Sequence, residues 1–342
     1  MSEMNPQQNV APSSESFSPP PPPSMPAAEP PALRPVYLRK PAIILFVVGL
    51  LILIGGVAKF IPGGIGTGGA VCFWGVLLFA FSFIPLPKIG PDAPPPMSMF
   101  ERIAGVFYEP SRVFKNLRSH PKWLAGLLVI AFLNIAYLVA FTQRLTPERI
   151  VNFTADKMAE TPFIPPEAVA RQREEGLEQA KNPVQRVGTA IKSIVGVFVF
   201  MSLLGALYML GVLVFGGRIN FWQSLCVIIY ASVPIVVIQK VLSFPLLYIK
   251  DVDDIHPILN QETLVQDNLG VLFTPADHPV LFVLASAIGL LSFYALWLKA
   301  TGLKNGGQKV SKGAAWGTAV LFWLIGLVLV TSITALFPSF IS

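Results

Sequence analysis

Charged side chains are confined to a few segments of this chain, and long apolar segments separate them. Seven stretches of 18 to 30 residues contain no Asp, Glu, Lys or Arg. A helix needs about 20 apolar residues to cross the hydrocarbon core of a bilayer. The pattern therefore predicts seven membrane-spanning helices, at residues 42–58, 69–86, 123–142, 193–215, 222–241, 279–298 and 314–336.

These spans predict an all-α fold, a polytopic transmembrane helical bundle in which an N-terminal two-helix hairpin precedes a five-helix core. The expected parts are a disordered, Pro-rich cytoplasmic tail at 1–36, a transmembrane hairpin at 37–88, a cytoplasmic interfacial amphipathic segment at 89–122, and a membrane domain at 123–338 with outer loops at 143–188 and 251–278. The first 35 residues hold 11 of the 32 prolines. We interpret this tail as a tether or, alternatively, as a ligand for a proline-reading domain.

The first outer loop carries helix signals of its own. Proline is favoured in the first turn of a helix, and Pro147 and Pro166 both precede polar segments rich in helix-forming residues. We expect two short helices that begin near these two prolines.

Composition excludes an ordinary soluble protein. Hydrophobic residues make up 53% of the chain and charged residues only 13%, whereas a soluble domain carries about 25% charged residues. Cys72 and Cys226 both lie inside apolar stretches, so the polar loops offer no disulfide framework and no thiolate metal site. The net charge is +6, and most of the charged residues lie in the segments between the spans. We therefore interpret this charge through its distribution across the membrane and expect no nucleic-acid partner.

The distribution of Lys and Arg predicts the orientation of the chain. If the N-terminus is cytoplasmic, the segments on that side carry 14 basic and six acidic residues, whereas all others carry 11 basic and 13 acidic residues. Cytoplasmic loops of membrane proteins are enriched in Lys and Arg. We therefore expect a multi-pass protein of the cell (cytoplasmic/inner) membrane with a cytoplasmic N-terminus and an exoplasmic C-terminus.

Sequence signatures of enzymes are missing from this chain. It contains no HExxH, GxSxG, CxxC or P-loop pattern, so we expect no catalytic residues, no cofactor and no enzymatic activity. Asp251, Asp253, Asp254 and His256 could supply metal ligands, but their spacing matches no standard calcium loop. We predict no metal site there and interpret the cluster as a solvated acidic loop. A metal-dependent enzyme is the third hypothesis for function.

Residues 99–118, ahead of the third span, combine an apolar face with a basic one. Phe100, Ile103, Ala104 and Phe107 recur at helical spacing, and Val113, Phe114 and Leu117 do so after Pro110. A helix of this kind lies in the membrane interface and attracts anionic headgroups. The predicted lipid-surface contacts are Arg102, Arg112, Lys115 and Arg118.

Lys240 is embedded in an apolar run, where a charged group is costly. Its ammonium group either extends outward to the water interface or belongs to a buried polar site. The spans also contain the side-chain amides of Gln239, Asn134 and Gln223. A polar site of Lys240, Gln239 and Asn134 is the basis of an alternative function, a small-solute or ion transporter.

From about residue 104 to 338 the chain resembles the Yip family, membrane proteins named for interaction with Ypt/Rab GTPases, and in particular its bacterial branch. The motifs that carry the resemblance are Glu109-Pro110, Val113-Phe114 and Trp123, Phe215-Gly216-Gly217 and Phe221, Tyr230-Ala231-Ser232-Val233-Pro234, Asn268-Leu269-Gly270, and the hairpin from Lys304 to Lys312. The resemblance implies five membrane helices with a cytoplasmic N-terminus and an exoplasmic C-terminus. Eukaryotic relatives act in vesicle traffic by binding prenylated GTPases, and they lack the Pro-rich tail and the extra hairpin.

The function we expect from the sequence is therefore that of a non-enzymatic membrane scaffold or interaction protein. Its partners are the lipid bilayer and anionic lipids, with membrane proteins or self-association as additional partners.

Overall fold

The computed structural model describes residues 33–89, 93–161 and 164–340, and most of the predicted tail at 1–36 lies outside these residues. The described residues form helices and no strand, which confirms the all-α prediction. The α-helices are α1 (Arg39–Val57), α2 (Gly64–Phe81), α3 (Met99–Tyr108), α4 (Pro110–Ser119), α5 (Leu124–Leu145), α6 (Pro147–Ala159), α7 (Pro166–Lys181), α8 (Pro183–Val214), α9 (Phe221–Ile249), α10 (Pro279–Ser286), α11 (Leu290–Gly306) and α12 (Lys312–Leu336).

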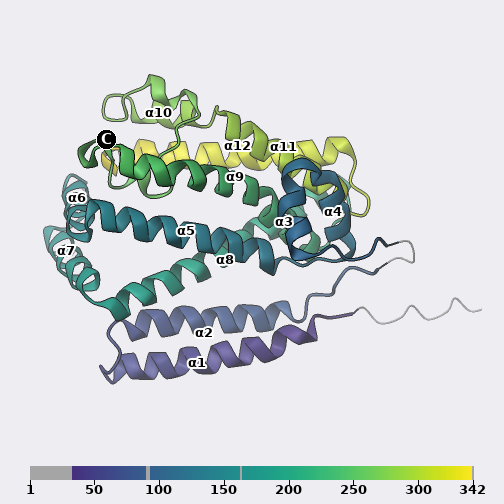
Figure 1. Cartoon of the computed structure of the whole chain (residues 1–342), viewed down its shortest axis with the longest axis horizontal. Helices are drawn as coiled ribbons and strands as arrows, with labels where there is room; N and C mark the ends of the chain where they lie inside the picture. The colour runs from purple at the N-terminus through teal and green to yellow at the C-terminus, as the bar shows by residue number, and fades with distance from the viewer. Residues whose placement is uncertain (1–32, 90–92, 162–163, 341–342) are drawn as a thin grey trace, which may run out of the picture. The chain divides into compact units, whose positions relative to one another are not determined.

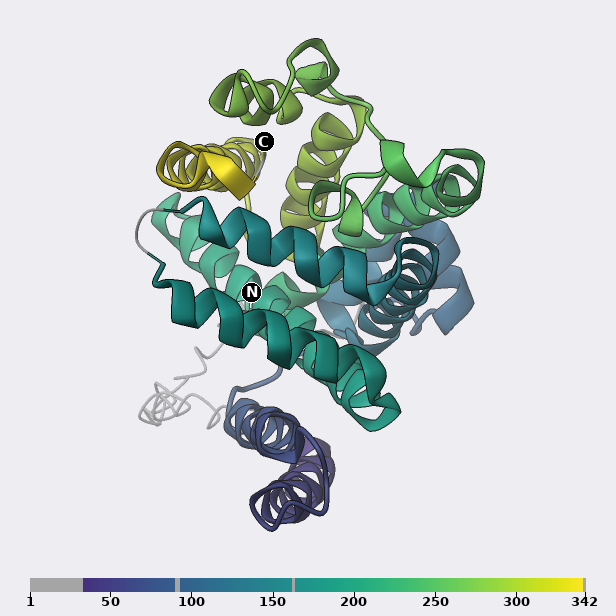
Figure 2. The ribbon, with the colours of Figure 1, turned by 90° about the vertical axis from the view of Figure 1, so that its left-hand side faces the viewer.

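The helices place the start and the end of the described chain at opposite ends of the bundle (Figure 1). At one end lie α3 and α4, which pack beside α11 and the start of α9. Residue 33 is at this end too, because its carbonyl accepts a hydrogen bond from the amide of Leu86 at 2.8 Å. Helices α6 and α7 cross the other end (Figure 2), where the Thr161 hydroxyl lies 3.3 Å from that of Ser339.

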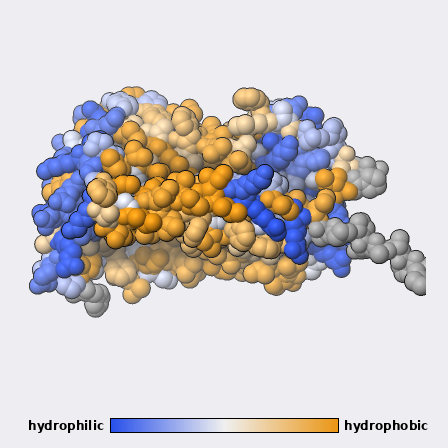
Figure 3. Space-filling model, turned by 90° about the horizontal axis from the view of Figure 1, so that it is seen from below, coloured by the Kyte–Doolittle hydropathy of each residue, from blue (hydrophilic) through white to orange (hydrophobic). Residues whose placement is uncertain are grey.

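Six of the helices are long and apolar enough to cross a membrane: α1 with the short helical turn before it, α2, α5, α8, α9 and α12. The side chains of α1 and α12 that point away from the bundle are apolar and exposed. Figure 3 shows the resulting surface, an apolar band with hydrophilic residues on both sides. Exposed apolar area this large is unfavourable in water and is what a lipid-facing surface requires.

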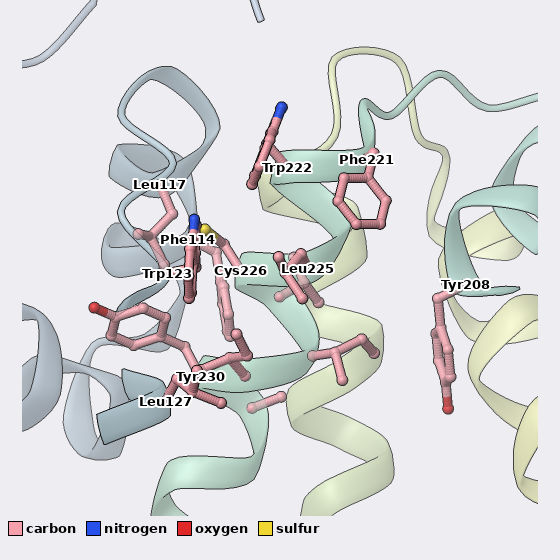
Figure 4. Packing of buried hydrophobic residues seen from close by; sticks show 14 of the residues in the cluster. Phe114, Leu117, Trp123, Leu127, Tyr208, Phe221, Trp222, Leu225, Cys226 and Tyr230 are labelled. Carbon is pink, nitrogen blue, oxygen red and sulfur yellow. The ribbon is translucent and has the colours of Figure 1, made fainter. Parts of the chain in front are cut away.

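Helix α9 forms the centre of the fold. Every side chain from 224 to 231 is fully buried. In Figure 4, Leu225, Cys226 and Tyr230 of this stretch lie on the side of α9 where Phe114 and Leu117 of α4 and Leu127 of α5 are found. A helix that is apolar on all sides must be surrounded by protein or by lipid, and α3, α4, α5, α8 and α11 all pack against α9.

The α1–α2 hairpin is held by glycines at which the two backbones touch. A Cβ atom at Gly49 would lie 2.5 Å from the amide nitrogen of Cys72, and one at Gly68 would lie 2.6 Å from the carbonyl oxygen of Gly49. These distances leave no space for a methyl group. Small residues at such crossings allow membrane helices to approach closely enough for dispersion contacts along their length.

The prediction of one continuous helix at 279–298 is wrong. The chain forms α10, which ends at Ser286, passes through an extended Gly289 and then forms α11. Residues 267–269 lie beside this break: the Leu269 amide donates to the Ile288 carbonyl at 3.0 Å, and the Leu291 amide donates to the Asp267 carboxylate at 2.6 Å. The backbone groups freed by the break are therefore satisfied by another part of the chain, which membrane proteins require.

The boundaries of other elements also differ from those predicted. Helix α2 begins at Gly64 and ends at Phe81, about five residues earlier than its predicted span, because the turn at Gly63 has φ +70° and the chain reaches Pro85 and Pro87 soon after. Helix α8 begins ten residues early, at Pro183, where Asn182 caps it. The two helices expected near Pro147 and Pro166 are confirmed.

Replacing Gly68 by Ala should destabilise the hairpin, because the added methyl group overlaps the backbone of α1. Overpacking of this kind costs about 1–3 kcal/mol. The matched control is Gly69→Ala, since a Cβ at Gly69 meets no atom within 4 Å. Thermal unfolding in detergent micelles measures the difference, and equal melting temperatures for the two variants would contradict backbone contact at Gly68.

Candidate functional site

The basic segment predicted at 99–118 folds as two short helices joined at a corner. Ser98 caps α3: its amide donates to the Glu101 carboxylate at 2.7 Å, and its hydroxyl accepts from the Glu101 amide at 3.2 Å. Pro110 then begins α4. Arg112 forms an ion pair with Glu109 at 2.9 Å across the corner. The cap thus sets the start of α3, and Pro110 sets the start of α4.

The apolar side chains of the two helices face different surroundings. Val113, Phe114 and Leu117 of α4 are fully buried in the protein core rather than in lipid. On α3, by contrast, Phe100 is 81% exposed and Tyr108 is 70% exposed. The apolar surface that this segment offers to a membrane therefore comes from α3, whereas α4 attaches the segment to α9 and α11.

The four predicted basic contacts fall into two groups. Arg112, Lys115 and Arg118 are exposed on α4. Arg102 is only 4% exposed, and its guanidinium group lies beside the Tyr230 hydroxyl. Its Nε and Nη1 atoms make no hydrogen bond within the described residues. Arg102 thus belongs to the interior in this structure and does not present its charge to a lipid surface.

Two cavities open beside α4. The first, of about 780 Å³, lies between the Pro94–Met97 segment and the α3–α4 corner, and its lining includes Glu101 and Glu109 as well as Arg112 and Lys115. The second, of about 550 Å³, lies between α4 and the C-terminal end of α11. The buried side chain of Asn116 fixes the wall of the first cavity, since its amide donates to the Pro95 carbonyl at 2.7 Å and its oxygen accepts from the Met97 amide at 3.2 Å.

Lys240 lies at the other side of the bundle under the loop that follows α9. Its side chain is 4% exposed, its ammonium group donates a hydrogen bond to the Glu262 carbonyl, and the Nζ atom lies 4.4 Å from the centre of the Tyr137 ring. The Tyr137 hydroxyl in turn donates to the Asn260 carbonyl at 3.0 Å. Lys240 therefore fastens the loop to α5 and α9, and it neither extends into water nor lines the two cavities beside α4.

The structure does not assemble the predicted intramembrane polar site. Gln239 and Asn134 are half-buried, and no hydrogen bond joins either of them to Lys240 among the described residues. Gln223 has a different role: its side-chain oxygen accepts from the Asn220 amide at 2.9 Å and completes the N-terminal cap of α9. Gln223 thus serves a helix end and Lys240 a loop contact.

The acidic loop residues do not gather around one point. Asp253 pairs with Arg149 at 2.9 Å, and the His256 Nδ1 atom accepts from the amides of Ile258 and Leu259. Within the part of the chain that the structure describes, no three His, Cys, Asp or Glu side chains are placed to hold a metal ion.

Comparison with known proteins gives one result for this chain. A family model described as Yip1 domain matches residues 104–333, which agrees with the resemblance seen in the motifs between 104 and 338. No curated protein and no solved structure matches the chain significantly.

Replacing Lys240 by Met should loosen the loop after α9. The change removes a hydrogen bond from a charged donor, which contributes about 1.5–3 kcal/mol, and leaves the Glu262 carbonyl without its donor. Hydrogen exchange of the amides at 255–264 should accelerate by about tenfold or more. Gln239→Leu is the control and should leave these amides protected. Unchanged protection in Lys240→Met would contradict the fastening role.

The N-terminal turn of α3 should loosen in acid. The hydrogen bond from the Ser98 amide lowers the pKa of Glu101 below its ordinary value of 4.5. Because the folded-state pKa is the lower one, this stabilisation is fully present above about pH 4.5 and is lost as the pH falls through the folded pKa. Amide exchange at 98–102, compared with Glu101→Gln at each pH, reports the loss. If the ratio of the amide exchange rates of the two proteins stays constant across this pH range, the prediction is refuted.

Proposed function

Because the chain belongs to the Yip family of multi-pass membrane proteins, we propose that it is a non-enzymatic scaffold or interaction protein of the cell (cytoplasmic/inner) membrane. In this proposal the end with α3 and α4 is cytoplasmic, as is the N-terminus, and the C-terminus is exoplasmic. The excess of Lys and Arg in the segments at the α3–α4 end supports this orientation. Membrane proteins, or further copies of this chain, are the partners that the scaffold role requires.

One observation carries the proposal that the scaffold contacts lipid through α3 and α4. The aromatic side chains of Phe100 and Tyr108 are exposed on α3, and the cations Arg112, Lys115 and Arg118 are exposed on α4, which follows α3 directly. Aromatic and apolar groups insert at the boundary between headgroups and acyl chains, while basic groups attract anionic lipid. Since α4 is anchored in the core by Phe114, the corner is held at a fixed height relative to the membrane helices.

A role as a transporter receives less support from the geometry. Transport needs a polar site that water can reach from either side. The ammonium group of Lys240 is instead engaged by the loop after α9 and by Tyr137.

A spin label at position 100 tests the lipid contact. In a Cys72→Ser background, a label on Phe100→Cys in anionic nanodiscs should be reached by oxygen, which partitions into lipid, much more readily than by a water-soluble nickel complex. A label on Lys309→Cys, at an exposed position beyond α11, should show the opposite preference. If the nickel complex reaches both labels equally, α3 does not enter the membrane interface.

Crosslinking in native membranes tests the scaffold role itself. Defined neighbours, either membrane proteins or a second copy of this chain, should be recovered reproducibly. Recovery of only random abundant neighbours would contradict the role.

A further inference from the structure

The cavity of about 550 Å³ between α4 and α11, here called the basic cavity, gathers positive charge from distant parts of the sequence. Four of its lining residues are cations that come from the segment after α2, from α4 and from α11. The lining residues that matter here are Lys88, Lys115, Arg118 and Lys304, together with Gln223 and Asn305. No Asp or Glu is among the described residues that line it.

The walls of the basic cavity are fixed by hydrogen bonds. The Gln223 side chain, 2% exposed, donates to the Arg118 carbonyl at 2.9 Å and joins the end of α4 to the start of α9. The Asn305 amide is 3.4 Å from the Ser111 hydroxyl and joins α11 to α4. The His120 ring lies 2.9 Å from the Pro94 carbonyl at the third wall. The cations are therefore presented by a preformed site, which lowers the entropy cost of binding.

Three of the four cations have no acidic partner among the described residues. Lys115, Arg118 and Lys304 form no ion pair with any described residue. The neighbouring cavity of about 780 Å³ differs, because Glu101 and Glu109 accompany Arg112 and Lys115 in its lining. Clustered cations in a concave site concentrate the field and favour an anionic ligand.

We propose that the basic cavity binds the phosphate groups of a phospholipid headgroup that carries at least two negative charges. Amine and guanidinium donors are the groups that recognise phosphate in proteins, and a volume of about 550 Å³ is within the range of small-ligand sites. The cavity lies where α9 begins and α11 ends, which is the level at which membrane helices meet the headgroup layer. Basic pockets at the cytoplasmic ends of membrane helices bind headgroups of this kind.

This proposal extends the proposed lipid contact. It rests on the proposed function for one premise, which is that this end of the bundle lies at a membrane surface. The two sites share Lys115 and Arg118, but each also uses residues of its own. Phe100 and Arg112 belong to the α3–α4 corner and do not line the basic cavity, and Lys304 lines the cavity but lies outside the 99–118 segment. The two ideas can therefore fail separately.

The full chain in nanodiscs provides the test, with cardiolipin as the probe. Cardiolipin carries two phosphates, and phosphatidylglycerol at equal total charge is the reference lipid. Native mass spectrometry should show preferential retention of cardiolipin by the natural protein. Lys304→Gln and Arg118→Gln should each weaken it about fivefold, because a basic residue near an anionic membrane contributes about 1 kcal/mol.

Control variants distinguish the loss of a positive charge in the cavity from a loss of folding and from an effect on the α3–α4 corner. Lys304→Arg keeps the charge and should retain cardiolipin, and thermal unfolding of all variants identifies any that fail to fold. Arg112→Gln, which removes a charge from the corner but not from the basic cavity, should retain cardiolipin even where the depth of the Phe100 label changes. Equal retention by Lys304→Gln, Lys304→Arg and the natural protein would overturn the proposal.

A soluble anion is the other source of the same chemistry, and pyrophosphate tests it. Binding of pyrophosphate is measured in nanodiscs of uncharged phosphatidylcholine. The assignment to lipid would be overturned if the protein binds pyrophosphate more tightly than it retains cardiolipin and if Lys304→Gln abolishes the pyrophosphate binding. Cardiolipin retention that millimolar pyrophosphate leaves unchanged would support it.

Discussion

The structure depends on one constraint, which is that every backbone N–H and C=O group in the hydrocarbon layer must find a partner within the protein. Helices satisfy it along their length, and within the described residues six helices are long and apolar enough to do so across a bilayer. The constraint acts most visibly where helices are interrupted or begin. Asp267 receives the amide of Leu291 at the break before α11, and Asn220 with Gln223 caps the start of α9.

Helix α9 connects the two ends of the bundle on which the functional argument rests. Its first turns are enclosed by α3, α4, α5, α8 and α11, so the α3–α4 corner is attached to the most buried part of the protein. Near its other end, Lys240 holds the loop that follows. The polar residues of α9 thus serve attachment at both ends, and the surface chemistry lies on the elements around it.

The sequence predicted what local patterns determine. Charge-free length indicated the membrane helices, and Pro147 and Pro166 indicated the starts of α6 and α7. It did not predict features that depend on distant residues. The backbone at the break near Gly289 is hydrogen-bonded by Asp267 and its neighbours, and Arg102 is buried beside Tyr230. The basic cavity forms because the fold brings Lys304 close to Arg118. No sequence spacing predicts this proximity, although the sequence placed both residues on the same side of the membrane.

The central claim is that a bilayer surrounds the bundle with its α3–α4 end in the cytoplasm. Labelling with a membrane-impermeant thiol reagent in intact cells tests it most directly, because the natural Cys226 is buried and Cys72 lies within α2. A cysteine at Glu174, exposed on α7, should be labelled at once, whereas a cysteine at Lys309 should be labelled only after the membrane is permeabilised. Immediate labelling at Lys309 with protection at Glu174 would contradict the account.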